Sequence, residues 1–264
     1  MNKFKRYEKA SEQVLPENMP IVARIDGSNF LKLTDEHFEK PFDAEFESLM
    51  NSAAKGVLEY CTEAKLAYIH SDEISTVIRP SHEPFLAGRT QKLASLLAAK
   101  ATAAFTAEFG KPASFDCRVF VMPKWEVVDY FEWRQEAAWT NCLHSTCFYE
   151  LAEQASKNFA HERLEEADNS EKQEILFHEF GINANDIPTH RKRGRCVLQE
   201  EVETPVEEWF DDKEKYERLL KKGYITKGET VKRNELRLDN DIPLFSQNRR
   251  YIDYAIEDPI PPVA

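Results

Sequence analysis

The first half of the sequence predicts an α+β fold of the ferredoxin-like kind, in which a split βαβ unit gives the order strand, helix, strand, strand, helix, strand. Short apolar or alternating runs have the length and β-branched content of strands. Two longer segments between them repeat apolar residues every three or four positions, as helices do. The same architecture forms the palm of many polymerases and cyclases, so the fold alone leaves the function open. In chain order, the predicted elements occupy 21–25, 44–61, 66–70, 74–78, 88–109 and 115–122.

The predicted strands place two acidic segments at their ends. The first strand ends at Asp26-Gly27, and the residues 71–73 form the tip between the second and third strands. Asp43 is a good N-cap for the helix that joins the first two strands. We expect the first and second strands to be neighbours at the centre of the sheet, so that Asp26 and Asp72 share one edge.

The second half is more helical and more charged. Its densest basic cluster lies at 188–195, and acidic residues follow it at 200–203. We therefore divide the chain into a palm-like catalytic region, 1–138, and a helical, basic C-terminal region, 139–264, packed on it. The predicted helices of the second half occupy 125–138, 141–159, 162–167, 170–180 and 211–222.

Composition limits the class of protein. The chain has 264 residues, enough for a full hydrophobic core, and a net charge of −12, which argues against indiscriminate nucleic-acid binding but allows a local basic face. Its five cysteines include no Cys-x-x-Cys pair, so we expect reduced thiols and no zinc site. We see no apolar run of membrane-spanning length and no signal peptide. These features predict a cytoplasmic protein without a membrane partner.

The paired carboxylates point to metal chemistry. Two carboxylates held side by side repel each other unless a cation lies between them, and oxygen ligands without nearby Cys or His suit Mg²⁺. The backbone carbonyl of Gly27 could complete the set. The alternative is that Asp26-Gly27 is an ordinary turn and 71–73 the loop of a β-hairpin.

Six pieces of the sequence resemble the histidine-tRNA guanylyltransferases and their relatives, which extend RNA in the 3′-to-5′ direction. The pieces occur in that family's order and at similar spacings, which makes the set specific although each piece alone is weak. They lie at 24–30, 40–43, 71–73, 89–92, 115–119 and 129–135, with weaker similarity at 174–177 and 192–194.

The resemblance implies a role for each matching residue. Asp26, the Gly27 backbone and Asp72 match the ligands of two catalytic Mg²⁺ ions, and Glu73 matches a supporting catalytic position. The positions that match nucleotide or triphosphate contacts are Ser28, Asn29, Phe30, Lys40, Asp43, Ser71, Arg89, Lys92 and Arg118. The candidate RNA contacts are Arg134, Asn141, Arg191, Lys192 and Arg193, although a solvated loop explains the last three equally well.

One segment departs from the guanylyltransferase pattern. Where those enzymes carry His-Ile-Asn-Asn-Leu-Tyr-Asn, this chain has residues 139–145 and keeps only Asn141 and Leu143. In the family, that segment is tied to the untemplated addition of guanylate to histidine tRNA. The chain is in this respect similar to the Thg-like bacterial and archaeal branch, whose members repair truncated tRNA 5′ ends against a template strand.

The resemblance therefore implies a two-step nucleotidyl transfer that uses ATP, GTP and other NTPs, two Mg²⁺ ions and tRNA, in a homotetramer. The alternatives that the residues leave open are untemplated guanylate addition, a palm-type nucleotide cyclase or dinucleotide synthase, and a non-catalytic RNA-binding module. RNA-binding modules of this fold usually carry aromatic residues on their central strands. Here those strands end in Asp26 and Asp72.

Overall fold

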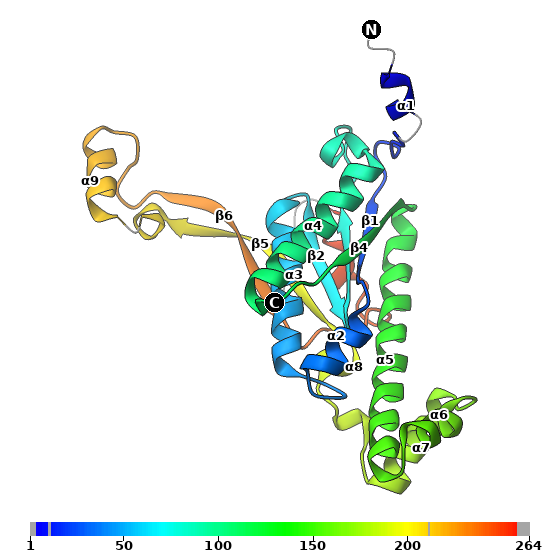
Figure 1. The fold of residues 1–264 in the computed structure, drawn as a ribbon. Coiled ribbons are helices and arrows are strands. Elements are labelled where there is room, and N and C mark those ends of the chain that lie inside the picture. The colour runs from blue at the N-terminus through cyan, green and yellow to red at the C-terminus, as the bar shows by residue number, and fades with distance from the viewer. Residues whose placement is uncertain (1–3, 10–11, 211, 258–264) are drawn as a thin grey trace.

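The computed structural model of the chain describes residues 4–9, 12–210 and 212–257 (Figure 1). Helices and strands alternate in the first half, and two long strands and several helices follow in the second. The strands are β1 (Ile21–Gly27), β2 (Ala64–His70), β3 (Glu73–Ile78), β4 (Phe115–Val121), β5 (Arg195–Pro205) and β6 (Thr230–Asp239). The α-helices are α1 (Lys5–Lys9), α2 (Phe30–His37), α3 (Ala44–Tyr60), α4 (Thr90–Phe109), α5 (Lys124–Gln154), α6 (Lys157–Leu164), α7 (Asn169–Phe180), α8 (Thr189–Lys192), α9 (Lys213–Lys221) and α10 (Arg250–Asp253). Short 3₁₀ helices cover Phe85–Gly88, Ala184–Asp186 and Val206–Trp209.

The strands form one antiparallel sheet in the order β4-β1-β3-β2-β5-β6, and its first four strands form the predicted ferredoxin-like fold. The expectation that β1 and β2 are neighbours is wrong, because β3 lies between them. The reason is that α3 carries the chain across the sheet, so β1 and β2 run parallel and leave a gap that β3 fills after a tight turn. Since both strands run the same way, Asp26 and the β2–β3 turn still meet at one edge.

The second half contains two strands that were not predicted. Strands β5 and β6 pair with each other and extend the palm sheet beyond β2. The helix expected at 125–138 and most of the one expected at 141–159 form a single 31-residue helix, α5, which ends at Gln154 before α6 begins at Lys157. The proposed division between residues 138 and 139 therefore falls inside an element. Helix α2 was not predicted. The last residues of the proposed C-terminal region, 258–264, lie outside the described residues.

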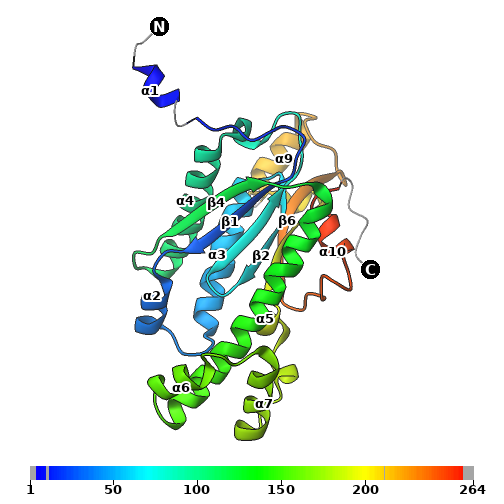
Figure 2. The ribbon, with the colours of Figure 1, turned by 90° about the vertical axis from the view of Figure 1, so that its right-hand side faces the viewer.

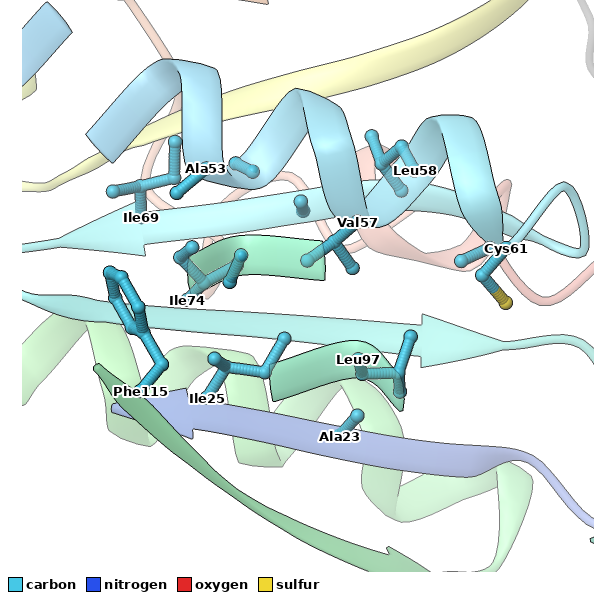
Figure 3. Packing of buried hydrophobic residues seen from close by; sticks show 14 of the residues in the cluster. Ala23, Ile25, Ala53, Val57, Leu58, Cys61, Ile69, Ile74, Leu97 and Phe115 are labelled. Carbon is cyan, nitrogen blue, oxygen red and sulfur yellow. The ribbon is translucent and has the colours of Figure 1, made fainter. Parts of the chain in front are cut away.

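Helices cover both faces of the sheet (Figure 2). On one face, α3 and α4 pack on the sheet; Asp43 begins α3 by accepting a hydrogen bond from the Phe46 amide at 2.9 Å, as its N-cap position predicts. Val57 of α3 and Ile25 of β1 belong to the resulting core, which Figure 3 shows from close by. On the other face, α5 and the chain around Phe245 bury Tyr68 and Phe131.

Two parts project from this body (Figure 1). The C-terminal half of α5 packs against α6 and α7 around a smaller core that includes Leu143 and Leu176. The outer halves of β5 and β6 form a two-stranded arm that carries α9. Exposed ion pairs such as Lys232 with Glu201, at 2.7 Å, join the strands of the arm. A two-stranded ribbon is marginally stable on its own, so the arm is the part of the sheet with least support.

All five cysteines are free thiols, as expected, and four of them are buried. In the described part of the chain, no helix is both long enough and apolar enough to cross a membrane.

Candidate active site

The predicted pair of aspartates meets at the edge where β1 ends. Asp26 lies opposite Glu73 in the β1–β3 ladder, and the next amide, that of Gly27, donates a hydrogen bond to the Asp72 carbonyl at 3.0 Å. The end of β1 is thereby tied to the tip of the β2–β3 hairpin. This contact holds the two carboxylate-bearing segments side by side.

The site is electrostatically suited to a cation. Burial raises the pKa of Asp26 above its usual value, and the negative charges of Asp72 and Glu73 raise it further. Within the described residues, no group of three or more Asp, Glu, His or Cys side chains is arranged to hold a metal ion. Two carboxylates with a neighbouring backbone carbonyl are nevertheless the usual protein share of a Mg²⁺ site, in which substrate phosphates and water supply the remaining ligands. The residues present therefore fit Mg²⁺ with a nucleotide.

The loop after Asp26 is shaped by close packing. A β-carbon on Gly27 would lie 2.4 Å from the Phe30 ring, so only glycine fits there. Phe30 is buried against Phe105 and Phe115, with ring centroids 5.2 and 4.8 Å away. This packing fixes the start of α2, whose N-cap Asn29 is left-handed and gives no side-chain cap. The uncapped amides of α2 beside Asp26 form a place where a phosphate can bind.

The predicted nucleotide residues on the following loop line one pocket with Ser71 and Asp72. Lys40 donates to the Thr34 hydroxyl at 2.6 Å and pairs with Asp35 at 3.2 Å.

Asp43 accepts backbone hydrogen bonds with both of its carboxylate oxygens, at 2.9 Å from Glu39 and from Phe46. Burial opposes ionisation of Asp43, but these hydrogen bonds outweigh it and lower its pKa.

The same pocket reaches from the aspartate edge to helices α5 and α8. Asn141 and Tyr149 of α5 line it, as do Phe42 and Arg191, whose guanidinium is 5.1 Å from the centre of the Phe42 ring. A pocket that combines charged and aromatic side chains beside Asp72 is suited to a nucleotide.

Glu73 is a buried support for the hairpin. Arg134 donates to its two oxygens at 2.7 Å each, and Arg24 contacts it at 2.8 Å. Burial would raise the pKa of Glu73, but the hydrogen bond and charge of His70 and the charges of Arg134 and Arg24 outweigh it and lower the pKa to about 2. With its oxygens engaged in this way, Glu73 fits the supporting part of its predicted role.

The sequence reasoning missed the cations around Glu73. Arg134 was a candidate RNA contact, but it is 6% exposed and occupied by Glu73, which leaves it little surface to offer RNA. His70 was left without a role. The sequence did contain a sign that Arg24 lies near the aspartates. Arg24 lies two positions before Asp26 in an otherwise apolar strand, and alternate residues of a strand share a face.

The three basic residues that were predicted to contact a triphosphate lie in two different parts of the fold. Arg118 lies opposite Arg24 in the β1–β4 ladder, on the same face as Asp26. Arg89 and Lys92 lie at the start of α4, where Arg89 pairs with Glu12 at 3.1 Å. The end of α4 that packs on Phe30 is about 20 Å further along the helix axis. Within one chain, Arg89 and Lys92 do not reach Asp26.

The predicted basic cluster is partly turned inward. Arg191 donates to Glu47 of α3 at 2.9 Å, and Lys192 donates to the Asn185 carbonyl. The Arg193 carbonyl accepts a hydrogen bond from Tyr68 at 2.7 Å. All three are half-buried, and Asn141 is exposed. The cluster therefore fastens α8 to the body and offers only part of its charge to solvent.

Comparisons with known proteins identify the family of this chain. A family model described as tRNAHis guanylyltransferase matches residues 1–123, and one described as Thg1 C terminal domain matches residues 125–241. The tRNA(His) guanylyltransferase of Schizosaccharomyces pombe is 37% identical over 233 residues, which cover 84% of this chain and 87% of that protein.

Solved structures extend the likeness over nearly the whole chain. A bacterial tRNA(HIS) guanylyltransferase (Thg1)-like protein in complex with ATP has a TM-score of 0.76 at 29% identity, over 97% of this chain and 98% of that one. A bacterial Thg1-like protein in complex with GTP gives 0.73 at 28% identity, over 96% and 97%. By sequence and by fold, the chain belongs to the tRNAHis guanylyltransferase family of nucleotidyltransferase enzymes.

Proposed function

We propose that this chain is a 3′-to-5′ nucleotidyltransferase that adds nucleotides to the 5′ end of tRNA against a template strand. The observation that carries the proposal is the pair Asp26 and Asp72, whose segments are joined by the Gly27–Asp72 backbone hydrogen bond, with Asp72 also lining the pocket of Lys40 and Asp43. The complexes of the bacterial Thg1-like proteins with ATP and GTP support these nucleotides as substrates.

Two transfer steps fit the site. In the first, the 5′-monophosphate of the RNA attacks the α-phosphorus of ATP, which releases pyrophosphate and leaves an adenylylated 5′ end. In the second, the 3′-hydroxyl of the incoming NTP attacks that end and releases AMP. Asp26, the Gly27 carbonyl and Asp72 would hold two Mg²⁺ ions, which when bound lower the pKa of a hydroxyl and offset charge on the leaving oxygen.

The other residues of the site bind and orient the nucleotide. The free amides at the start of α2, including that of Phe30, and the side chains of Ser28, Ser71 and Lys40 donate to phosphate oxygens. Asp43 holds the wall of the pocket by fixing the 39–46 backbone. Arg118 offsets the charge of the incoming triphosphate from the neighbouring strand.

Two features bear on the alternatives. The curated relatives are named tRNA(His) guanylyltransferases, which favours untemplated guanylate addition as the second candidate. A non-catalytic RNA-binding sheet is disfavoured, because α3 and α4 cover one face of this sheet and α5 covers the face that would stack bases (Figure 2).

We also propose that the protein works as a homotetramer in the cytoplasm. Arg89 and Lys92 reach a triphosphate at Asp26 only if a second copy supplies them. The projecting β5–β6 arm, which has little support within the chain, is suited to pack on another copy (Figure 1).

The substrate is tested with two RNAs, a tRNA that lacks its 5′ nucleotide and carries a 5′-monophosphate, and a full-length histidine tRNA. With ATP, Mg²⁺ and the NTPs added singly, the proposal expects the truncated tRNA to gain only the nucleotide that pairs with the opposite strand. Addition of guanylate alone, regardless of the opposite base, would establish the untemplated reaction instead. Cyclic or linear dinucleotides from NTP without RNA extension would contradict both.

A further inference from the structure

A groove runs along α5 next to the nucleotide pocket. Trp133, Ala137, Thr140 and His144 follow one another at helical spacing along one stripe of α5. Glu136 and Asn141 of α5 and Lys172 of α7 complete the lining. Trp133 and His144 are about 16 Å apart along the helix axis, at 1.5 Å per residue. Of these residues, only Asn141 took part in the site described above.

Trp133 offers a fixed aromatic surface. Its residue is 52% exposed, although it lies between the buried Phe131 and Arg134. The Arg134 guanidinium lies 4.4 Å from the centre of the indole ring, and Glu73 holds that guanidinium from both oxygens. Arg134 therefore holds the ring in place and leaves much of it open to solvent. A rigid, half-exposed tryptophan is a stacking surface for a planar group.

Lys172 supplies an independent observation. The residue is 8% exposed and lines the groove, yet no carboxylate of the described residues forms an ion pair with it. Its ammonium group is not one of the buried polar atoms that lack a partner, so it is reached by solvent from the groove. Without a carboxylate to neutralise it, the group is suited to pair with an anion. His144 lies near it, since burial and then the charge of Lys172 lower the pKa of His144. Its imidazole is thus disfavoured as a competing cation.

The groove is continuous with the nucleotide pocket. Asn141 lines both, from the α5 turn between them. At the other end, Arg134 follows Trp133 in sequence and binds Glu73, which follows Asp72. A strand that lies in the groove therefore has one end beside the carboxylate pair.

We infer that this groove binds an RNA strand, with one base stacked on Trp133 and a backbone phosphate paired with Lys172. A planar base and an anion on one chain describe a nucleic acid strand, and they match the exposed indole face of Trp133 and the ammonium group of Lys172. The inference rests on the proposed function for its choice of RNA, and it identifies a binding surface that the basic cluster at 190–195 does not supply.

The first test compares Trp133→Ala and Trp133→Phe with a matched control, Trp125→Ala, which removes a more exposed tryptophan of the same helix, outside the groove. Loss of one stacked base is expected to weaken tRNA binding and raise the KM for tRNA by about 5- to 150-fold in Trp133→Ala, with phenylalanine restoring most of it. The KM for ATP should be unchanged in all three, which also shows that each variant is folded.

The second test uses Lys172→Met, which keeps the packed side-chain stem, and the control Lys100→Met on α4, across the sheet. The plot of log Kd for tRNA against log salt should lose about one unit of slope in Lys172→Met and none in the control. If Lys172→Met lost only affinity for free phosphate or pyrophosphate, the RNA assignment would be overturned.

The RNA groove and the proposed function can be contradicted independently of each other. If the wild-type protein extends tRNA while Trp133→Ala and Lys172→Met behave like their controls, the groove is not the RNA path and the proposed function stands. If both variants weaken tRNA binding but the wild-type protein extends no RNA, the groove stands and the proposed function fails.

Discussion

The Gly27 amide donates a hydrogen bond to the Asp72 carbonyl at 3.0 Å, and this bond joins the end of β1 to the turn between β2 and β3. It is a contact between main-chain atoms, so it depends on the backbone path of the loop and not on a side chain. The closeness of the two aspartates therefore depends on whatever fixes that path, above all Gly27 and the buried Phe30 ring.

Gly27→Ala should impair both folding and catalysis. The new methyl group would meet the Phe30 ring, and such overpacking costs about 1–3 kcal/mol. Urea denaturation measures the loss of stability, and single-turnover kinetics measure the loss of rate. Gly181→Ala is the control, because its strain lies at the end of α7 with no neighbour within 4 Å. A Gly27→Ala protein with wild-type rate would show that the loop path is not critical.

Glu73→Gln should destabilise the protein strongly. The substitution leaves Arg134 buried without its carboxylate, and breaking a buried ion pair costs about 3–5 kcal/mol. The matched control is Glu179→Gln, which breaks the exposed pair with Arg163 and should cost about 0–1 kcal/mol. Equal unfolding midpoints for the two variants would contradict the assigned role of Glu73.

The same carboxylate predicts an acid-sensitive component of stability. Because the folded pKa of Glu73 is lowered from 4.5 to about 2, its contribution is fully present above pH 4.5 and is lost as the pH falls toward 2. Unfolding free energies between these pH values should fall more steeply in the wild-type protein than in Glu73→Gln. Parallel curves would mean that Glu73 has an ordinary pKa.

Substitutions at two helix N-caps distinguish an effect on stability from an effect on substrate binding. Asp43→Ala and Asp168→Ala each remove an N-cap, of α3 and α7, and each should cost about 0.5–2 kcal/mol. Only Asp43 also fixes the pocket wall through the Glu39 amide, so only Asp43→Ala should raise the KM for ATP. A similar KM in both variants would remove Asp43 from the nucleotide site.

Mixing two inactive variants tests whether the site is shared between copies. Lys92→Ala and Asp72→Ala should each lose activity, since one lacks a triphosphate cation and the other a carboxylate. If Lys92 acts from a neighbouring copy, mixed oligomers contain some sites with both groups intact, and part of the activity returns. No recovery in oligomers shown to be mixed would place both groups in the same chain's site.

The palm was predictable because its strands are short, buried and bounded by turn residues. The order of the strands in the sheet was harder to predict, because it depends on how α3 crosses the sheet. No local sequence pattern indicated that β3 lies between β1 and β2. Strand β5 was missed because its outer half, Glu200 to Glu203, is charged and pairs only with β6. Likewise, the prediction interrupted the helix at 139–140, whereas α5 is continuous there and packs on α6 and α7.

The positions of the candidate site residues were predictable where they lie at the ends of elements. Asp26, Gly27, Asp72 and the cap Asp43 lie at element ends that the sequence marks. Contacts across the fold could not be foreseen, such as Arg134 with Glu73, because they are set by the packing of α5 on the sheet.

The most direct measurement follows the adenylylated 5′ end on truncated, monophosphorylated tRNA with labelled ATP and Mg²⁺. We expect Asp26→Asn and Asp72→Asn to abolish its formation while the proteins stay folded and still bind ATP. The control Asp129→Asn removes an exposed carboxylate of α5 that pairs with Arg249, and it should react like the wild-type protein. Adenylylation that persists in either Asp26→Asn or Asp72→Asn would contradict the central role of the carboxylate pair.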